Sequence, residues 1–373
     1  MIYLDSAATS LYKPETVQAA VIEAINTMAS PGRGAHAPAM RAAECCYDCR
    51  EKLARLFHVP SPEQVVFTFN ATHALNIAIS SLVKPGMRVL LSGYEHNSVT
   101  RPLAALGAET VVIDTPLFDA SAFPERAAQE IGAVDAVVCT HVSNVLGYVL
   151  PVEALAELCR KHGKPLIVDA SQSAGILPLD FTALGADFAA MPGHKGLLGP
   201  QGTGVLLCKN DAKALLYGGS GSDSVSQSMP DYLPDRLEAG THNVAGIAGL
   251  SAGLDYILAR GCDDIRSHER ALLEQLYGAL SALPGLRCFY SPDAARQSSV
   301  LSVLPETMSC EAFADALNEA GVAVRTGLHC APTAHRTAGT LETGTVRFSF
   351  SPFLTERQIA CAGEICKKIM KNH

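Results

Sequence analysis

Apolar and polar residues follow one rhythm through most of the chain and another near its C-terminus. In the longer, first part, short apolar runs alternate with longer amphipathic stretches, and Ala74–Leu82 and Glu153–Lys161 have the spacing of helices. Buried strands that alternate with helices are typical of a mostly parallel α/β sheet covered on both faces. The runs that we interpret as strands are Val65–Phe69, Val89–Ser92, Val111–Asp114, Val134–Thr140, Leu166–Asp169, Phe188–Met191 and Val205–Cys208.

After about Gly240 the pattern changes to that of an α+β region. A chain of 373 residues is long enough for two packed domains. We predict a large domain over residues 14–250 and a smaller α+β C-terminal domain over residues 251–373, joined by the N-terminal segment 1–13. Gly218–Ser228 is rich in Gly and Ser and is predicted to be a loop. The predicted C-terminal elements are helices at Ala245–Ala259, His268–Leu283, Glu311–Glu319 and Thr355–Lys368 and strands at Val300–Leu304 and Val346–Ser349.

Composition and charge narrow the class of protein. Apolar residues make up 48% of the chain and charged residues 18%, which fits a compact globular enzyme. The net charge of -8 and the absence of basic clusters argue against a nucleic-acid-binding protein. No apolar run approaches the roughly 20 residues that span a bilayer, and the N-terminus lacks the pattern of a signal peptide. We therefore expect a cytoplasmic enzyme with no nucleic-acid or membrane partner.

The chain has 12 cysteines, which we expect to be reduced because no export signal is present. Cys46 and Cys49 form a C-x-x-C pair with Cys45 beside it. A zinc site would need a second pair at suitable spacing, and none follows. We therefore predict that these cysteines pack within a helix, and we predict no metal site.

Lys195 is the first candidate for chemistry. It lies among glycines just after an apolar strand, in the segment Met191-Pro-Gly-His-Lys-Gly196. Glycines let a ligand approach the backbone closely, and a lysine held there can form an imine with an aldehyde cofactor. The alternative is an exposed lysine in a turn. The segment is no P-loop, because Lys195 is followed directly by Gly196 and not by Ser or Thr.

Polar residues follow several of the predicted strands, where ligands bind in parallel α/β sheets. Asp169 could keep a pyridine nitrogen protonated, and Gln172 could bind a ring oxygen. Thr72 opens a helix whose N-terminus could hold a phosphate. His96 could stack on a flat cofactor, and Asn144 could reach the ring or the substrate. The alternatives are helix caps or turn residues at each of these positions.

Two residues near the C-terminus are candidates for substrate chemistry. Cys330 is flanked by Gly and Pro, which predicts a loop, and its neighbours His329 and Arg325 could lower its pKa and make it a nucleophile. Arg347 interrupts an apolar strand, and its guanidinium suits a carboxylate. The alternatives are an ordinary loop cysteine and an internal ion pair.

The order and spacing of these signals resemble the cysteine desulfurase and selenocysteine lyase branch of the class V aminotransferase superfamily, which consists of fold-type-I pyridoxal 5′-phosphate (PLP) enzymes. The resemblance covers nearly the whole chain. The segments that carry it are Tyr3-Leu-Asp-Ser-Ala-Ala-Thr9, Glu95-His-Asn97, His141-Val-Ser-Asn-Val-Leu-Gly147, Val168-Asp-Ala-Ser-Gln172, Gly193-His-Lys195, Glu238-Ala-Gly-Thr241, Arg325-Thr-Gly-Leu-His-Cys330 and Arg347.

The resemblance implies a fold-type-I PLP enzyme and assigns a role to each matching residue. The implied cofactor residues are Lys195 as the Schiff-base lysine, Asp169 at the pyridinium nitrogen, Gln172 at the ring oxygen, His96 stacked on the ring, Asn144 beside it, Ala71, Thr72 and His194 at the phosphate, and Thr241 at the phosphate of the neighbouring subunit. The implied substrate residues are Arg347 and Asn144 at the carboxylate, His36 at the site entrance, Ala7, and Cys330 as the sulfur acceptor. Lys195, Cys330 and His96 are the implied catalytic residues.

The resemblance further implies a homodimeric PLP-dependent cysteine desulfurase, which converts L-cysteine to L-alanine and passes sulfur to Cys330 and then to an acceptor protein. The alternatives are a selenocysteine lyase acting on L-selenocysteine, an aminotransferase in which Cys330 is incidental, and a protein that binds PLP without turnover. Pro192, Ala71 and His73 depart from the commoner pattern around the phosphate, and residues 331–345 differ from the better-known members.

Overall fold

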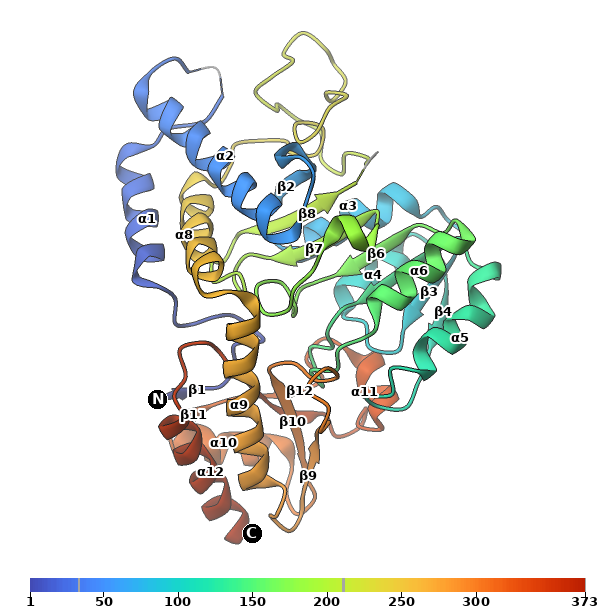
Figure 1. Cartoon of the computed structure of the whole chain (residues 1–373), viewed down its shortest axis with the longest axis vertical. Helices are drawn as coiled ribbons and strands as arrows, with labels where there is room; N and C mark the ends of the chain where they lie inside the picture. Colours follow the sequence, from blue (N-terminus) through green and yellow to red (C-terminus); the bar gives the residue numbers. More distant parts are fainter. Residues whose placement is uncertain (33, 210–211, 373) are drawn as a thin grey trace.

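A seven-stranded sheet forms the centre of the molecule (Figure 1), which is described here by a computed structural model that covers residues 1–32, 34–209 and 212–372. The strand order is β2-β8-β7-β6-β5-β3-β4. Neighbouring strands from β7 to β4 run parallel, and β8 is antiparallel to both of its neighbours. The strands are β2 (Val65–Thr68), β3 (Arg88–Ser92), β4 (Glu109–Ile113), β5 (Ala136–Thr140), β6 (Leu166–Asp169), β7 (Phe188–Pro192) and β8 (Gly204–Cys208). The prediction of a mostly parallel sheet is confirmed, and each predicted strand of the first part overlaps one of these.

Helices cover both faces of this sheet because alternate strand residues point to opposite sides. Leu90 of β3 packs into a core with α2, α5, α6 and α8. Its neighbours Val89 and Leu91 pack into a second core with α3 and α4. The helices of this part are α1 (Glu15–Thr27), α2 (Ala37–Phe57), α3 (Ala71–Leu82), α4 (Asn97–Ala105), α5 (Ala122–Glu130), α6 (Val152–His162), α7 (Phe181–Leu184) and α8 (Val244–Arg260), with 3₁₀ turns at Pro62–Gln64 and Ile131–Ala133.

A four-stranded antiparallel sheet, β12-β13-β10-β9, lies in the C-terminal part with a third core. The N-terminal segment joins this part, because β1 (Ile2–Tyr3) pairs in parallel with β11 (Val322–Ala323). The predicted boundary after residue 250 falls inside α8, and the division into two domains stays a prediction. The remaining elements are α9 (Cys262–Leu280), β9 (Leu286–Phe289), β10 (Val300–Pro305), α10 (Cys310–Glu319), β12 (Arg325–Gly327), α11 (Pro332–Ala338), β13 (Thr345–Ser349) and α12 (Glu356–Lys371).

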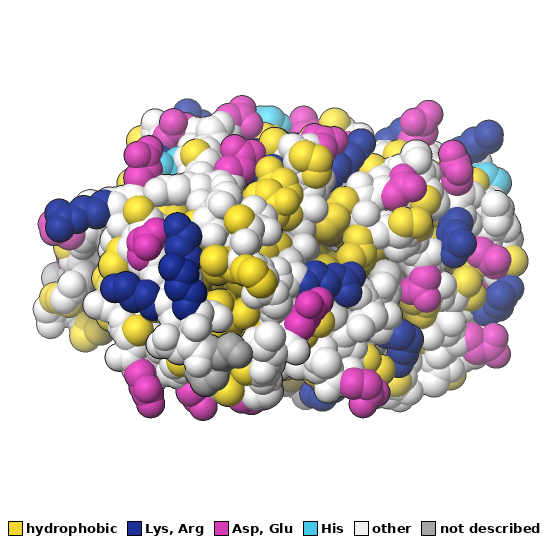
Figure 2. Space-filling view, turned by 90° about the horizontal axis from the view of Figure 1, so that it is seen from below, with side chains coloured by type: hydrophobic (Ala, Val, Ile, Leu, Met, Phe, Trp, Pro, Cys, Tyr) yellow, Lys and Arg dark blue, Asp and Glu magenta, His cyan; other side chains and the backbone are white. Residues whose placement is uncertain are grey.

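The cysteine pair Cys46 and Cys49 lies inside α2 and is buried in the first core. Burial raises the pKa of Cys46 to about 12, so the thiol stays protonated. The described residues contain no group of three His, Cys, Asp or Glu side chains placed to hold a metal ion. Among them, no helix is both long enough and apolar enough to cross a membrane. On the face shown in Figure 2, charged side chains of both signs surround a band of hydrophobic ones.

Candidate active site

A cavity of about 110 Å³ lies at the carboxyl ends of β2, β3, β5, β6 and β7. Ligands bind at this edge of parallel α/β sheets because the loops there diverge. All of the residues predicted to bind a cofactor line it, with the exception of Thr241. The lining residues are Asn70, Ala71, Thr72, His96, Ser98, Thr140, Val142, Asn144, Asp169, Ser171, Gln172, Pro192, His194 and Lys195.

Lys195 follows β7 and lines both this cavity and a second one. Desolvation lowers the pKa of its amine to about 8, although the carboxylate of Asp169 opposes the shift. The glycines on either side serve packing rather than ligand approach. A Cβ added at Gly193 would lie 2.1 Å from Thr203 Oγ1, and one added at Gly196 would lie 2.3 Å from the carbonyl oxygen of Ala174. The glycines therefore set the tight path of the chain that holds Lys195.

Asp169 ends β6 and is buried. Its Oδ1 accepts hydrogen bonds from the backbone N–H and the hydroxyl of Ser171, at 2.9 and 2.5 Å. These bonds form a turn and not the helix cap that was the alternative for Asp169, because the chain after β6 is a turn and the next described helix, α7, begins only at Phe181. Because both bonds reach Oδ1, the other carboxylate oxygen remains able to bind a cofactor N–H.

The N-terminus of α3 supplies a second group of donors. Asn70 caps the helix by accepting from the N–H of His73 at 2.9 Å. The backbone N–H groups of Ala71 and Thr72 have no acceptor within the described part of the chain, and the Thr72 hydroxyl lies 2.8 Å from that of Ser98. Free N–H groups at a helix N-terminus suit a phosphate, so this end of the cavity fits one.

Two histidines line the cavity as neutral rings. His96 caps α4 through its Nδ1, which accepts from the N–H of Ser98 at 3.0 Å, and desolvation lowers its pKa. His194 lies 3.1 Å from Thr9 Oγ1, and desolvation lowers its pKa to about 4. Both rings are suited to stacking or to neutral hydrogen bonds. His73 lies outside this cavity and stacks on Phe69, with 4.9 Å between the ring centroids.

Arg347 of β13 combines the two roles that the sequence left open. Its Nη2 forms an ion pair with Asp5 Oδ1 at 3.0 Å, and its Nη1 donates to the carbonyl of Asn144 at 2.9 Å. Its Nε is buried with no partner among the described residues. A buried donor without a partner is costly, so a substrate carboxylate would be a favourable acceptor for it.

Cys330 lies exposed in the turn between β12 and α11. His329 and Cys330 both have positive φ angles, 49° and 56°. The backbone N–H of Asn97 donates to the carbonyl of Cys330 at 2.7 Å, and the side chain of Asn144 donates to the carbonyl of His329 at 2.8 Å. Asn144 therefore holds this turn with the amide that was expected to face the ring. These two bonds attach the thiol-bearing turn to the rim of the cavity.

His329 cannot supply the positive charge that its position beside Cys330 suggested. Its ring is buried, and desolvation together with nearby Arg347 holds its pKa at about 2. It is instead a neutral partner of Thr345, with 3.1 Å between Nε2 and Oγ1. Arg325 is the charged neighbour that remains, and it is paired with Asp5.

Three predicted residues do not line the Lys195–Asp169 cavity: His36 and Thr241 lie away from it, and Ala7 contributes a backbone contact. His36 is exposed and caps α2, and Thr241 is exposed and lines a separate cavity beside Glu238. The carbonyl of Ala7 accepts from Gln172 Nε2 at 3.0 Å, which leaves Ala7 at the second cavity that Lys195 lines. A single chain therefore does not bring His36 or Thr241 to the cavity.

The sequence did not reveal the role of Asp5. It stands in the segment Tyr3-Leu-Asp-Ser-Ala-Ala-Thr9, but its partners Arg325 and Arg347 are more than 300 positions away. The only signal in the sequence was the need of Arg347 for an acidic partner inside an apolar strand.

Comparison with known proteins gives a consistent result. Residues 2–361 match the model of the family described as aminotransferase class-V. A probable cysteine desulfurase of Methanothermobacter thermautotrophicus is 35% identical over 99% of this chain and 94% of its own length. A probable cysteine desulfurase of Streptomyces coelicolor is 34% identical over 89% of this chain and 83% of its own length.

Solved structures agree with the sequence matches. An apo cysteine desulfurase from Thermococcus onnurineus NA1 has a TM-score of 0.90 and 29% identity, covering 100% of this chain and 95% of its own. A cysteine desulfurase from Escherichia coli, in an S-sulfonic acid form, has a TM-score of 0.87 and 29% identity, covering 99% and 94%. The predicted α/β fold is confirmed by these similarities.

Proposed function

We propose, on the premise that this chain belongs to the aminotransferase class-V family, that it is a PLP-dependent cysteine desulfurase. The reaction would convert L-cysteine to L-alanine and leave the sulfur on Cys330 as a persulfide. The observation that carries this proposal is the attachment of the Cys330 turn to the cavity through Asn97 and Asn144. That attachment supports the proposal that Lys195, Arg347 and Cys330 belong to one site.

The residues of the cavity fit PLP. Lys195 would carry it, the free oxygen of Asp169 would bind the pyridinium N–H, and the unpartnered amides of Ala71 and Thr72 would bind the phosphate. His96 would stack on the ring, and Pro192, which has no hydroxyl, would give no phosphate contact of the kind a serine gives. When bound, PLP withdraws electrons from the Cα of an amino acid and makes the Cα proton removable.

The residues of the chain would then divide the remaining work. The Nε of Arg347 would bind the substrate carboxylate and orient the amino acid. The amine of Lys195, with its pKa lowered to about 8, would be neutral often enough near neutral pH to accept the Cα proton. The Cys330 thiolate would attack the substrate sulfur. The bond from sulfur to Cβ would break, its electron pair would stay with carbon, and protonation there would give the methyl group of alanine.

The proposal extends to assembly and sulfur delivery. Thr241 is exposed and lies outside the Lys195–Asp169 cavity in one chain, which supports the prediction that it serves the neighbouring subunit of a homodimer. Cys330 is exposed, which supports transfer of its sulfur to an acceptor protein.

One assay separates this function from its rivals. The PLP-loaded protein is mixed with L-cysteine, and alanine, sulfide and keto acids are quantified. A desulfurase releases alanine and sulfur in equal amounts, an aminotransferase makes a keto acid in their place, and a protein that only binds PLP makes neither. Parallel reactions with L-selenocysteine test the lyase alternative, which requires selenocysteine to be the only productive substrate.

A further inference from the structure

Ser98, which was not among the predicted site residues, lines the Lys195–Asp169 cavity from the first turn of α4. Its hydroxyl oxygen lies 2.8 Å from that of Thr72 and 3.0 Å from Nδ1 of His96. Thr72 stands at the start of α3, where two backbone N–H groups have no acceptor among the described residues. The Ser98 hydroxyl therefore lies beside the end of the cavity that fits a phosphate.

The hydroxyl groups of the cavity differ in whether they are free to turn to a ligand. Four of the lining residues carry one. The hydroxyl of Thr140 donates to a backbone carbonyl at 3.1 Å, and that of Ser171 donates to Asp169 Oδ1 at 2.5 Å. The other two, of Thr72 and Ser98, bond to each other and have no carbonyl or carboxylate acceptor among the described residues. These two can bind a ligand without giving up such a bond.

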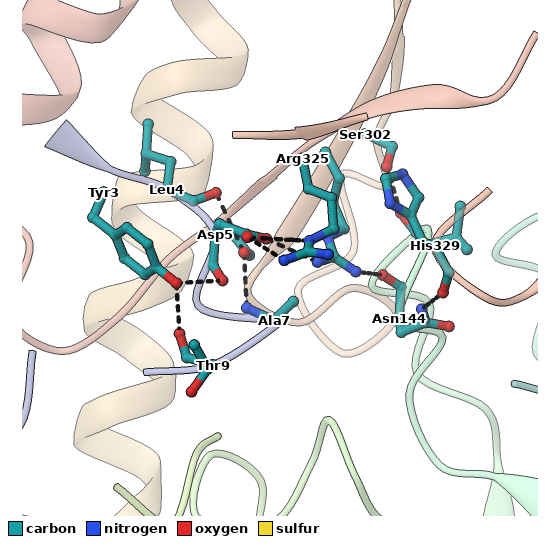
Figure 3. Close-up of polar contacts among 12 residues, drawn as sticks. Tyr3, Leu4, Asp5, Ala7, Thr9, Asn144, Ser302, Arg325 and His329 are labelled. Carbon is teal, nitrogen blue, oxygen red and sulfur yellow. Dashed lines mark hydrogen bonds and ion pairs between the residues drawn. The ribbon is translucent and has the colours of Figure 1, made fainter. Parts of the chain in front are cut away.

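The side-chain amides that line the cavity also hold parts of the chain. Asn144 donates to the carbonyl of His329 at 2.8 Å (Figure 3). Gln172 donates to the carbonyl of Ala7 at 3.0 Å. The hydroxyls beside α3 are not tied to the backbone in this way.

The hydrogen bonds of His96 allow the Ser98 hydroxyl to turn. Nδ1 of His96 accepts from the backbone N–H of Ser98 at 3.0 Å, so the proton of the neutral ring is on Nε2. The Ser98 hydroxyl can donate to the same nitrogen. When it turns away, Nδ1 keeps the backbone donor, so no acceptor is left without a partner.

A phosphate in this cavity would depend on uncharged donors. Lys195 is the only lysine or arginine among the described residues that line the cavity, and its amine would be occupied by the aldehyde of the cofactor. Pro192, which also lines the cavity, has neither a hydroxyl nor an N–H. Hydrogen bonds to a charged acceptor are stronger than those between neutral groups, so one further hydroxyl at this end should matter.

We propose that Ser98 is a further cofactor-binding residue, whose hydroxyl donates to the phosphate of PLP beside Thr72. It would supply a donor that Pro192 cannot supply. The inference rests on the proposed function, because it requires PLP to be the ligand of the cavity.

Pyridoxal is the probe for this inference, since it has the ring and the aldehyde of PLP but no phosphate. The measured quantities are the dissociation constants of PLP and of pyridoxal for the full-length, cofactor-free protein, obtained by absorbance titration. Ser98→Ala should weaken PLP binding about tenfold, the size of one hydrogen bond to a charged group, and leave pyridoxal binding within about twofold of the wild type. Ser98→Thr keeps a hydroxyl and should retain PLP affinity within about threefold of the wild type.

A role of Ser98 in positioning His96 predicts a different result. The ring of His96 would stack on PLP and on pyridoxal alike, so a loss of its position would weaken both ligands by the same factor. An equal loss for both ligands, or no loss for PLP, overturns the proposal. The matched control is Ser171→Ala, which removes a hydroxyl bound to Asp169 in the same cavity. It should change the affinities for both ligands by the same factor.

A spectroscopic measurement on the PLP-loaded protein gives a second readout. The phosphorus NMR resonance of PLP responds to the donors around the phosphate, so Ser98→Ala should shift it and Ser171→Ala should leave it in place. Alanine, a good helix former, is compatible with the first turn of α4, and circular dichroism checks that the variants fold.

Alanine release from cysteine separates this inference from the proposed function. If the wild type releases no alanine but Ser98→Ala loses affinity for PLP alone, the desulfurase function is wrong and the Ser98 assignment holds. If alanine is released and the affinities for PLP and pyridoxal change by the same factor, only the Ser98 assignment fails.

Discussion

The candidate active site has two halves, one with Asp169 and Lys195 and the other with Arg347 and Cys330, which are held in place by different means. Asp169 and Lys195 stand at the ends of neighbouring buried strands, β6 and β7, and their positions follow from the backbone of the central sheet. Arg347 and the Cys330 turn lie on the C-terminal sheet, and Arg347 depends on Asp5, which is 342 positions away in the chain. The first half is positioned by adjacent strands of one sheet, and the second by contacts between residues that are far apart in the sequence. Substitutions far from the chemistry should therefore harm substrate selection more than cofactor binding.

The two halves also differ in how burial and neighbouring charges shift the pKa values of their basic residues. Desolvation lowers the pKa of Lys195 to about 8 and brings its amine close to neutrality. Desolvation also lowers the pKa of Arg347, but the paired carboxylate of Asp5 opposes the shift. Burial therefore raises the neutral fraction of the Lys195 amine, whereas the ion pair with Asp5 favours the charged form of the Arg347 guanidinium.

The largest effect is expected from Lys195→Ala, which removes the proposed catalytic base. Alanine release from cysteine should fall at least about a thousandfold, within the usual contribution of general-base catalysis. The fold should survive, because the lost amine is one whose charged form is disfavoured by desolvation. Lys161→Ala, which removes an exposed lysine of α6, is the control. Retained desulfurase activity in the Lys195 variant would contradict the assignment.

Cys330→Ala tests the substrate half without disturbing the cofactor half. Alanine release from cysteine should fall at least about a hundredfold because the nucleophile is missing, while the visible absorption of bound PLP should remain. Mass spectrometry of the wild type after brief exposure to cysteine should find one added sulfur on the peptide that contains Cys330. Cys361→Ala, which removes another exposed cysteine, should keep full activity. Added sulfur on Cys46 or Cys49 would show that the proposed mechanism is wrong.

Much of the fold could be predicted because the central strands are short, continuous apolar runs. Several helices were missed where the pattern is weaker. α4 contains Pro102, and α11 has only seven residues and begins with a proline. α2 was predicted only as a helix around its cysteines, and its full length was missed because it mixes charged residues with them.

The residues of the candidate site likewise differ in whether the sequence alone could predict their roles. Lys195 and Asp169 stand in local motifs at the ends of strands, so their proximity could be predicted from the sequence alone. The roles of Asp5 and of Asn144 depend on contacts between distant segments, which neither periodicity nor spacing reveals. The neutrality of His329 also escaped prediction, because it results from burial in the folded chain.

The pH dependence of PLP uptake tests whether burial lowers the pKa of Lys195. The neutral amine is the form of Lys195 that combines with the aldehyde, so uptake by cofactor-free protein should be slow below its pKa and level off above it. With a pKa of about 8, the neutral fraction rises only about tenfold between pH 7 and pH 9. A lysine at its usual value would give about a hundredfold rise over that range. Stopped-flow absorbance measures the rate, and a rate that still climbs steeply above pH 9 would contradict the lowered pKa.

Thr241→Ala gives the smallest expected effect and asks whether the cofactor half is complete within one chain. Thr241 is exposed and lies outside the Lys195–Asp169 cavity, so its predicted bond to phosphate requires a neighbouring subunit. Loss of one hydrogen bond to a charged group should weaken PLP binding about tenfold, measured by equilibrium titration. Thr27→Ala, which removes a hydroxyl that donates to the carbonyl of Glu23, is the control. The difference between wild type and Thr241→Ala should disappear when dilution separates the subunits, as followed by sedimentation. A fully active monomer, or unchanged PLP affinity in the variant, would show that one chain builds the whole phosphate site.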